Sequence, residues 1–358
     1  MATRQHPLVS LVVATRNEAR HLPALLDSLA ASEYPVEHIE VLVVDGESTD
    51  GTREVALGYV SRLPGLRIVP NPQRITPAAF NRGIEASHGD YVGLVSGHST
   101  LSPSYVSETV AAFERLGADA DCIGGVYTNV GEGFWGEVIA RLISSPAVVG
   151  NAKFRFSQQE QRVDTVTGTY RREVYARIGL YDERLLRNQD NELNARLRRA
   201  GGTIFLVPRI RMAYQVRSTL RGALTQFFRN GKWTIYTQLL HPYAMSPRHF
   251  VPLGFVVGGA GVVALAVALG NPWVAVVPAA LYGAVVLRGA SGHGFSLRQF
   301  AAAVVAQPLL HLAYGIGSLV GIATSPRFLS RSRGYTPRSG AALGASADVA
   351  LTDSPREG

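Results

Sequence analysis

Two long stretches of the chain carry no charged side chain, and they constrain its fold more than any other feature. The first runs from Phe250 to Leu287 and the second from Gln299 to Pro326. Each exceeds the roughly 20 apolar residues that are needed to cross the hydrocarbon core of a bilayer. The sequence Gly270-Asn271-Pro272 divides the first stretch at a predicted tight turn. We therefore expect two to three transmembrane helices in residues 250–324.

The charges are distributed unevenly along the chain. Residues 193–347 contain 16 Lys or Arg and no Asp or Glu, whereas residues 1–192 are acidic on balance. A uniformly basic protein would suggest nucleic acid as a partner, but here the basic half contains the apolar stretches. We therefore expect membrane lipid, and no nucleic acid, as the partner of this half. The arginines and Lys232 that precede residue 250 place the N-terminal domain in the cytoplasm by the positive-inside rule.

The N-terminal half alternates strand-like and helix-like segments. The expected strands are Val9–Ala14, Glu40–Val44, Leu66–Val69 and Tyr91–Val95, and the expected helices are Glu18–Ala31, Thr49–Tyr59, Pro77–Ala86 and Pro103–Leu116. Such alternation is typical of an α/β fold with a mostly parallel sheet. The single cysteine, Cys122, excludes both an intramolecular disulfide and a cysteine-rich zinc site.

Polar residues follow the expected strands directly. Thr15-Arg16-Asn17-Glu18 follows the first strand, the run from Asp45 to Thr52 the second, and Ser96-Gly97-His98-Ser99 the fourth. In open α/β sheets, ligands bind beyond the carboxyl ends of the strands. The sequence contains neither GxGxxG at the first helix nor GxxxxGK[ST], which removes the main support for a dinucleotide or P-loop site.

Several of these segments together resemble the family 2 glycosyltransferases of GT-A fold. They are the run Val9 to Asn17, VVDGESTDGT at 43–52, AAFNRGIEASHGDY at 78–91, GLYDERLLRNQDNELNARLRRAG at 179–201, and QFFRNGKW at 226–233. The membrane-attached bacterial branch typified by succinoglycan glucosyltransferases is the most similar. The resemblance implies a Rossmann-like GT-A domain, a nucleotide-sugar donor, most simply a UDP-sugar, and a location in the inner membrane.

The resemblance also assigns roles to individual residues. It places Thr15, Asn17, Glu18, Asp45 and Ser96 at the donor nucleotide. Asp45 alone would be read as a turn residue that bonds its own backbone. Asp190 stands where the family has its catalytic base, and Gln189 replaces the acid that usually precedes that base. The alternative for Asp190 is an acidic residue that favours the N-terminus of a helix.

Two residues lie in the expected amphipathic segment before the membrane. Arg229 and Trp233 belong to the stretch Leu220 to Leu240. The family resemblance assigns them to the donor diphosphate and the acceptor, and an arginine can pair with phosphate oxygens bidentately. An arginine that reaches toward the headgroups and a tryptophan at the membrane interface remain a strong alternative.

The motif Ser96-Gly97-His98 departs most from the family pattern, which has Asp-x-Asp there. Neither carboxylate is present. His98 takes the position of the metal ligand, and imidazole suits Mn²⁺ better than Mg²⁺. A structural or substrate-contacting histidine is the other reading. We expect a divalent cation, Mn²⁺ or Mg²⁺, whose binding is uncertain without Asp-x-Asp.

The combined expectation is an inverting glycosyltransferase that moves a sugar onto a polyprenyl-linked acceptor in polysaccharide or glycolipid synthesis. The expected parts are a GT-A domain at 1–215, an interface segment at 216–249, membrane helices at 250–324 and a disordered tail at 325–358. Three crossings are favoured, which would place the tail outside. A polyprenyl-phosphate glycosyltransferase similar to the dolichol-phosphate synthases and a catalytically silent nucleotide-binding scaffold are the rival hypotheses.

Overall fold

The structure is a computed structural model that describes residues 6–150, 152–291, 294–341 and 343. These residues divide into two compact units. Unit 1 is built from the described parts of Met1–Val126, Gln158–Ala213 and Gly334–Gly358, and unit 2 from those of Tyr127–Ser157 and Tyr214–Arg333. Each unit therefore combines segments that are far apart in the sequence.

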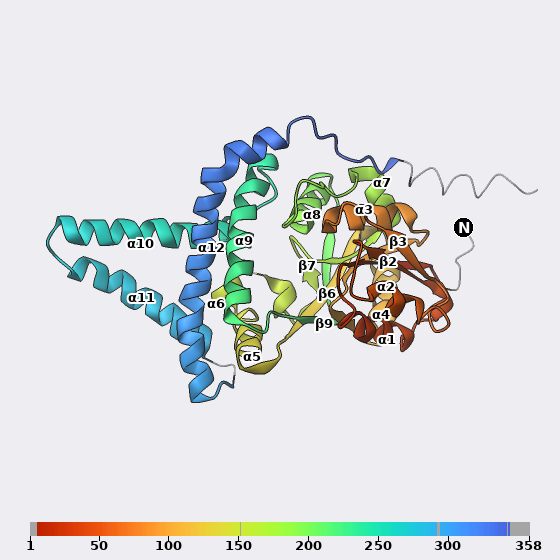
Figure 1. The fold of residues 1–358 in the computed structure, drawn as a ribbon, viewed down its shortest axis with the longest axis horizontal. Coiled ribbons are helices and arrows are strands. Elements are labelled where there is room, and N and C mark those ends of the chain that lie inside the picture. Colours follow the sequence, from red (N-terminus) through yellow and green to blue (C-terminus); the bar gives the residue numbers. More distant parts are fainter. Residues whose placement is uncertain (1–5, 151, 292–293, 342, 344–358) are drawn as a thin grey trace, which may run out of the picture. The chain divides into compact units, whose positions relative to one another are not determined.

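A mixed sheet forms the centre of unit 1 (Figure 1). Its strands are β1 Val9–Thr15, β2 Ile39–Asp45, β3 Leu66–Pro70, β4 Tyr91–Ser96, β5 Ser99–Leu101, β6 Cys122–Val130, β7 Gln161–Arg162, β8 Gly168–Arg171 and β9 Ile204–Gln215. The strand order is β3-β2-β1-β4-β8-β6-β9-β5, with β7 beside β9. Strand β1 pairs in parallel with β2 and β4, whereas β8 runs antiparallel to β4 and β6. The predicted α/β class is confirmed.

Helices connect the strands of unit 1. They are α1 Leu22–Ala30, α2 Thr52–Leu57, α3 Thr76–Ala86, α4 Tyr105–Leu116, α7 Arg172–Ile178 and α8 Gln189–Arg199, with short 3₁₀ turns at Val36–His38 and Gly117–Asp119. The first helix begins later than predicted. The Glu18 carbonyl accepts the N–H groups of both His21 and Leu22 in a turn, and Pro23 then stands in the first helical turn, where proline is favoured.

Helix α3 packs directly on strand β1. A Cβ atom at Gly83 would lie only 2.1 Å from Cγ1 of Val12, and Val12 itself is fully buried. Because glycine has no side chain, the helix axis approaches the sheet closely. This close approach fixes the position of Phe80 and Asn81, which lie on the same helix.

Unit 2 is helical apart from the ends of β6 and β9. Its helices are α5 Gly133–Leu142, α6 Pro146–Val149, α9 Leu220–Leu240, α10 Val251–Ala268, α11 Trp273–Ala290 and α12 Leu297–Arg331, with 3₁₀ turns at Lys153–Arg155 and Pro247–Phe250. Helices α9 and α12 lie side by side (Figure 1). Small residues permit this contact, since a Cβ at Gly231 or at Gly317 would lie within about 2 Å of a backbone oxygen of the other helix.

Three helical segments of unit 2 are long and apolar enough to cross a membrane. They are Pro247–Ala268, Trp273–Ala290 and Leu297–Arg331. Residues 325–331, which the sequence assigns to the tail, complete α12. The following described residues make specific contacts in unit 1, among them an ion pair of Arg338 with Glu85. Residues 344–358 of the predicted disordered tail lie outside the described residues.

Candidate functional site

The parallel strands of unit 1 bring their carboxyl ends together at one edge of the sheet. Thr15 at the end of β1 is in register with Asp45 at the end of β2, and Asp45 is in register with Pro70 of β3. On the other side of β1, Ala14 is in register with Ser96 of β4. The polar segments that follow these strands therefore meet at this edge, as the sequence predicts.

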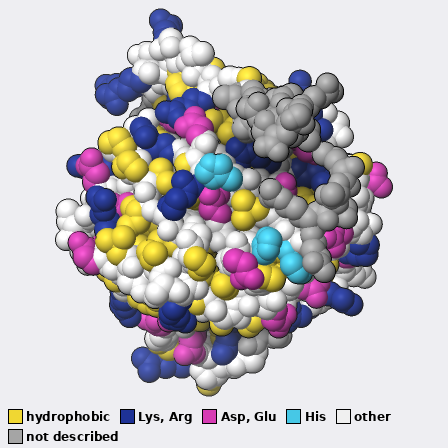
Figure 2. Space-filling model, turned by 90° about the vertical axis from the view of Figure 1, so that its right-hand side faces the viewer, with side chains coloured by type: hydrophobic (Ala, Val, Ile, Leu, Met, Phe, Trp, Pro, Cys, Tyr) yellow, Lys and Arg dark blue, Asp and Glu magenta, His cyan; other side chains and the backbone are white. Residues whose placement is uncertain are grey.

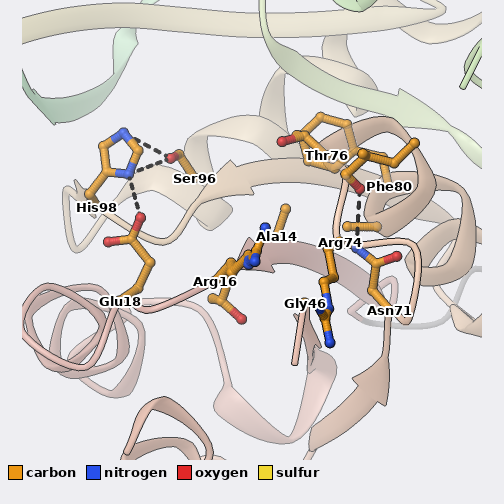
Figure 3. Close-up of a pocket in the computed structure, with 13 residues that line it drawn as sticks. Ala14, Arg16, Glu18, Gly46, Asn71, Arg74, Thr76, Phe80, Ser96 and His98 are labelled. Atoms are coloured by element: carbon orange, nitrogen blue, oxygen red, sulfur yellow. Dashed lines mark hydrogen bonds and ion pairs between the residues drawn. The ribbon is translucent and has the colours of Figure 1, made fainter. Parts of the chain in front are cut away.

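A pocket of about 280 Å³ opens at this edge (Figure 3). Its lining residues come from the ends of β1, β2 and β4, from the segments that follow β1, β2, β3 and β4, and from α3: Ala14, Thr15, Arg16, Glu18, Gly46, Asn71, Arg74, Ile75, Thr76, Ala79, Phe80, Ser96 and His98. The volume is close to the lower end for small-molecule sites. Three of the predicted donor residues, Thr15, Glu18 and Ser96, line the pocket, and so does the predicted metal ligand His98.

Glu18, Ser96 and His98 form one polar cluster at the pocket wall. Nδ1 of His98 lies 3.2 Å from Oε1 of Glu18 and 3.0 Å from Oγ of Ser96 (Figure 3). The Glu18 and His98 side chains are 21% and 26% exposed, so a ligand in the pocket can reach both.

The other two predicted donor residues hold the adjacent turn. Asn17 has a left-handed backbone, its N–H donates to Oγ of Ser48, and its side-chain oxygen accepts the N–H of Thr49. The buried Asp45 carboxylate lies 3.3 Å from the N–H of Ser48. In this structure both residues shape the loop that presents Gly46 to the pocket, and their contact with a nucleotide stays a prediction.

The donor atoms for a metal ion are few. Among the described residues, no three His, Cys, Asp or Glu side chains come together in a group that could hold an ion. The Glu18–His98 pair offers one carboxylate and one imidazole, which are ligand types that Mn²⁺ accepts. The pair therefore fits a cation only if the phosphates of a bound donor supply further oxygen ligands.

Asp190 is the second residue of α8, and it is half-buried. Oδ1 has no accessible surface and no hydrogen-bond partner among the described residues, while Oδ2 accepts a long hydrogen bond of 3.4 Å from the Thr167 hydroxyl. Burial raises the pKa of Asp190 to about 6, and the hydroxyls of Thr167 and Tyr181 oppose this shift. A carboxylate that served the helix terminus alone would have its pKa lowered. The side-chain oxygen of Gln189 is also buried without a partner.

Helix α3 connects the pocket to the loop that leads into α8. Phe80 lines the pocket, and its ring centroid lies 5.3 Å from that of Tyr181. The next residue, Asn81, is fully buried and hydrogen-bonds both the N–H and the carbonyl of Tyr181, at 2.8 and 3.0 Å. A third hydrogen bond, of 3.0 Å, joins Asn81 to the Glu183 carboxylate. The pocket wall and the loop before Asp190 are thus one hydrogen-bonded structure.

Arg229 and Trp233 belong to unit 2. Arg229 is exposed on α9. The Trp233 ring meets the rings of Tyr236 and Phe328 edge-on, with centroid distances of 5.2 and 5.7 Å. Trp233 therefore stabilises the contact between α9 and α12, and the predicted roles of both residues at the substrate stay predictions.

Sequence reasoning missed two arginines of the pocket. Arg16 lines the pocket and is exposed, and Arg74 lines it with a left-handed backbone and an ion pair to Glu47. Both follow parallel strands at the same edge as the predicted residues. Their position directly after β1 and in the loop after β3 was the signal that could have identified them.

The sequence matches one family model and several proteins of known name. Residues 10–179 match the family described as Glycosyl transferase family 2. The chain is 30% identical to the succinoglycan biosynthesis protein ExoA of Rhizobium meliloti (strain 1021), over 86% of this chain and 92% of that protein. It is 26% identical to a dolichyl N-acetyl-alpha-D-glucosaminyl phosphate 3-beta-D-2,3-diacetamido-2,3-dideoxy-beta-D-glucuronosyltransferase of Methanococcus voltae, over 61% of this chain and 70% of that protein.

A solved structure shares the fold. The crystal structure of S. aureus TarS 1-349 in complex with UDP-GlcNAc matches with a TM-score of 0.51 and 16% identity, over 92% of this chain and 93% of that one.

Proposed function

This chain belongs to the family 2 glycosyltransferases, and on that premise we propose that it moves a sugar from a UDP-linked donor, with inversion, to a polyprenyl-linked acceptor. Membership confirms the predicted GT-A fold and the predicted enzyme class, a glycosyltransferase. Beyond family membership, we propose the nucleotide of the donor, the inversion at the anomeric carbon and the identity of the acceptor.

The buried, unpartnered Oδ1 of Asp190 is the observation that carries the mechanism. In an inverting transfer, the acceptor hydroxyl oxygen attacks the anomeric carbon, the bond to the diphosphate oxygen breaks, and UDP leaves with the electron pair. Asp190 takes the proton from the attacking hydroxyl. A carboxylate with a pKa near 6 is ionised at neutral pH and is still a better proton acceptor than an ordinary aspartate.

The pocket at the strand ends suits the donor. The TarS structure of the same fold holds UDP-GlcNAc, and we assign the donor nucleotide of this chain to the pocket at its strand ends. Arg16 and Arg74 supply positive charge there for the diphosphate. Glu18 and His98 would hold a divalent cation together with donor phosphates, and such a cation would stabilise the charge on the leaving group.

Unit 2 supports an acceptor whose reactive end is held at the membrane. It contains the three apolar helices, and an enzyme fixed at a bilayer acts most readily on a substrate that is fixed there too. One relative acts in succinoglycan biosynthesis and another on a dolichyl phosphate sugar, by their names. Exopolysaccharide or glycolipid synthesis at the bacterial inner membrane follows, with unit 1 in the cytoplasm, where nucleotide sugars are made.

A guanidinium in unit 2 fits the phosphate of such an acceptor. Arg155 donates one hydrogen bond, of 2.9 Å, to Oδ1 of Asn129, and its guanidinium lies 5.2 Å from the centroid of the Phe154 ring. In the part of the chain that the structure describes, Arg155 has no carboxylate partner. Arginine has five N–H donors, so donors remain for an anion. Substitution of Arg155 by Gln should raise the acceptor KM and leave the donor KM unchanged.

The test is a screen of UDP-, GDP- and dTDP-sugars with the full chain in membranes and bacterial lipid extracts. We expect consumption of one UDP-sugar and a labelled lipid that carries at least two sugars. A product with one sugar on polyprenyl phosphate would instead identify a polyprenyl-phosphate glycosyltransferase. Nucleotide binding without turnover of any donor would favour the silent scaffold and contradict the proposal.

A further inference from the structure

Helix α12 presents one apolar face to its surroundings and packs the opposite face on protein. The exposed large residues fall at helical spacing along one stripe: Val305, Leu309, Leu312, Ile316, Leu319 and Ile322. The buried residues lie away from this stripe: Ala303, Ala306, Gln307, Leu310, Gly315, Gly317, Ser318 and Gly321. The helix has 35 residues, which gives a length of about 52 Å. The helix is therefore far longer than is needed to cross the hydrocarbon core of a bilayer. Its large exposed apolar side chains form a single stripe.

Helix α12 contacts the start of α10 and the end of α11, and it also packs on α5 and α9. Of these partners, α5 and α9 do not belong in the core of a membrane. Along its first half, α12 packs on α5 through Ala303, Ala306 and Leu310. Along its second half it runs beside α9, where Tyr314 bonds Thr234 and Thr324 bonds Tyr236. Helix α9 carries Arg221 and Arg229 on its exposed side. Since charges avoid the hydrocarbon region, α9, and α12 with it, belong at the membrane surface.

The pair α10 and α11 has the opposite character. In each of the three helical segments we consider the most apolar 18 residues. None of these residues is buried in the protein in Pro247–Ala268, 17% are buried in α11, and 39% are buried in α12. The helices meet at the turn Gly270-Asn271-Pro272, and Trp273 just after it is 73% exposed. A turn leaves backbone polar groups that lipid cannot satisfy, and tryptophan favours the interface. The tip of the hairpin therefore belongs at an interface.

The chain after α12 returns to unit 1. The Tyr335 hydroxyl accepts a hydrogen bond of 3.0 Å from the N–H of Glu183. Arg338 pairs with Glu85 at 2.8 Å and with Glu183 at 3.1 Å. Because these partners belong to unit 1, the segment after Arg333 and unit 1 must be on the same side of a membrane. The number of full crossings between residues 214 and 333 is therefore even.

We propose that α10 and α11 form a hairpin that crosses the membrane twice, and that α12 lies along the membrane surface on the side of unit 1. The exposed stripe of α12 faces the lipid, as in an interfacial amphipathic helix. This arrangement replaces the three crossings expected from hydropathy. It does not depend on which sugar the protein transfers.

The single native cysteine makes the topology measurable. Cys122 is fully buried, and burial raises the pKa of its thiol, so it reacts slowly with maleimides. Single substitutions introduce exposed cysteines in unit 1 (Ser61→Cys), at the hairpin tip (Asn271→Cys) and after α12 (Thr336→Cys). The full chain is labelled with a membrane-impermeant maleimide in intact spheroplasts and in inverted vesicles, with the parent chain as the background control.

The proposal makes one prediction for each site. Ser61→Cys and Thr336→Cys should be labelled from the same side, in inverted vesicles only, and Asn271→Cys in spheroplasts only. Labelling of Ser61→Cys and Thr336→Cys from opposite sides would restore three crossings. Labelling of Asn271→Cys from the side of Ser61, or from neither side, would contradict the double crossing.

Depth measurements test the position of α12 separately. A nitroxide on Leu312→Cys, near the middle of α12, should lie within about 10 Å of the headgroups. The matched control is Val257→Cys, near the middle of Pro247–Ala268, where the nitroxide should be deep and accessible to oxygen. Equal depths at the two positions would show that α12 crosses the membrane and would overturn the proposal.

Discussion

Nδ1 of His98 lies 3.2 Å from Oε1 of Glu18, although 80 positions separate the two residues in the sequence. The contact forms because the parallel strands β1 and β4 end side by side. Glu18 thus supplies a carboxylate at the position where the motif Ser96-Gly97-His98 has none. This carboxylate comes from another segment of the chain and lies beside the imidazole.

The first prediction concerns this pair and a divalent cation. Activity should require the cation, and Mn²⁺ should support it better than Mg²⁺, because imidazole is a better ligand for Mn²⁺. Glu18→Gln and His98→Ala should each raise the Mn²⁺ concentration for half-maximal activity on the order of 10-fold or more. His98→Asp should shift the preference toward Mg²⁺. Metal titrations at fixed donor measure both effects.

The control for the metal prediction is Ser96→Ala, which removes a hydroxyl beside His98 but leaves the carboxylate and the imidazole. Because the hydroxyl is not itself a proposed metal ligand, the metal requirement of this variant should rise less than that of Glu18→Gln or His98→Ala. Full activity in excess EDTA, with His98→Ala equal to the parent, would show that Arg16 and Arg74 stabilise the leaving group without an ion.

The second prediction concerns Asp190 as the base. Asp190→Asn should lower kcat by about 10² to 10⁴, because it removes proton transfer in the transition state, and should leave donor affinity nearly unchanged. Steady-state kinetics and UDP binding measure the two quantities. Turnover at the parent rate would eliminate Asp190 from this role.

The sequence predicts the features of this site that depend on local patterns, and it does not predict the contacts between distant segments. The buried runs of β1, β2 and β4 are continuous and apolar, so their ends, and the polar residues after them, were predictable. Strand β6 was not assigned, since its glycines Gly124 and Gly125 lower its strand propensity and are required by contacts with Val166 and Ile210. The contact of Glu18 with His98 and the return of Arg338 to unit 1 are long-range contacts without a local signal.

The third prediction follows from the pKa of about 6 for Asp190. The base must be ionised, so kcat should rise about tenfold per pH unit below pH 6 and level off above it. Stability should change in the opposite direction. Because the pKa of Asp190 in the folded protein lies above the ordinary aspartate value of 3.8, the native state loses stability as the pH rises from about 4 through 6, by at most about 3 kcal/mol.

Asp190→Asn removes this ionisation and provides the control. The variant should be more stable than the parent above pH 7 and similar to it near pH 4. Thermal unfolding of both proteins in detergent across this range measures the difference. Parallel curves at all pH values would mean that the carboxyl group is not desolvated in the folded state.

The fourth prediction tests the contact of α3 with the sheet. Gly83→Ala would place a Cβ 2.1 Å from Val12 Cγ1 and should cost about 1 to 3 kcal/mol of stability by overpacking. Gly58→Ala is the matched control, because a Cβ there meets its nearest atom at 3.4 Å and should change stability by less than about 1 kcal/mol. Equal effects of the two substitutions in thermal unfolding would contradict the close packing.

The last prediction concerns Asn81 as a positioning residue for Asp190. Asn81 holds both backbone polar groups of Tyr181 and the Glu183 carboxylate. Asn81→Ala leaves the backbone N–H and carbonyl of Tyr181 unpaired, which should cost about 1 to 3 kcal/mol of stability, and it releases the loop that leads into α8. With the loop released, water reaches Asp190 and its pKa falls. The kcat profile should therefore shift to lower pH while its plateau drops, and UDP binding should persist. Arg82→Ala, a change at the next residue of α3, whose side chain bonds Gln73, should leave the pH profile in place. A lower plateau at an unchanged apparent pKa would mean that Asn81 supports the fold without setting the environment of Asp190.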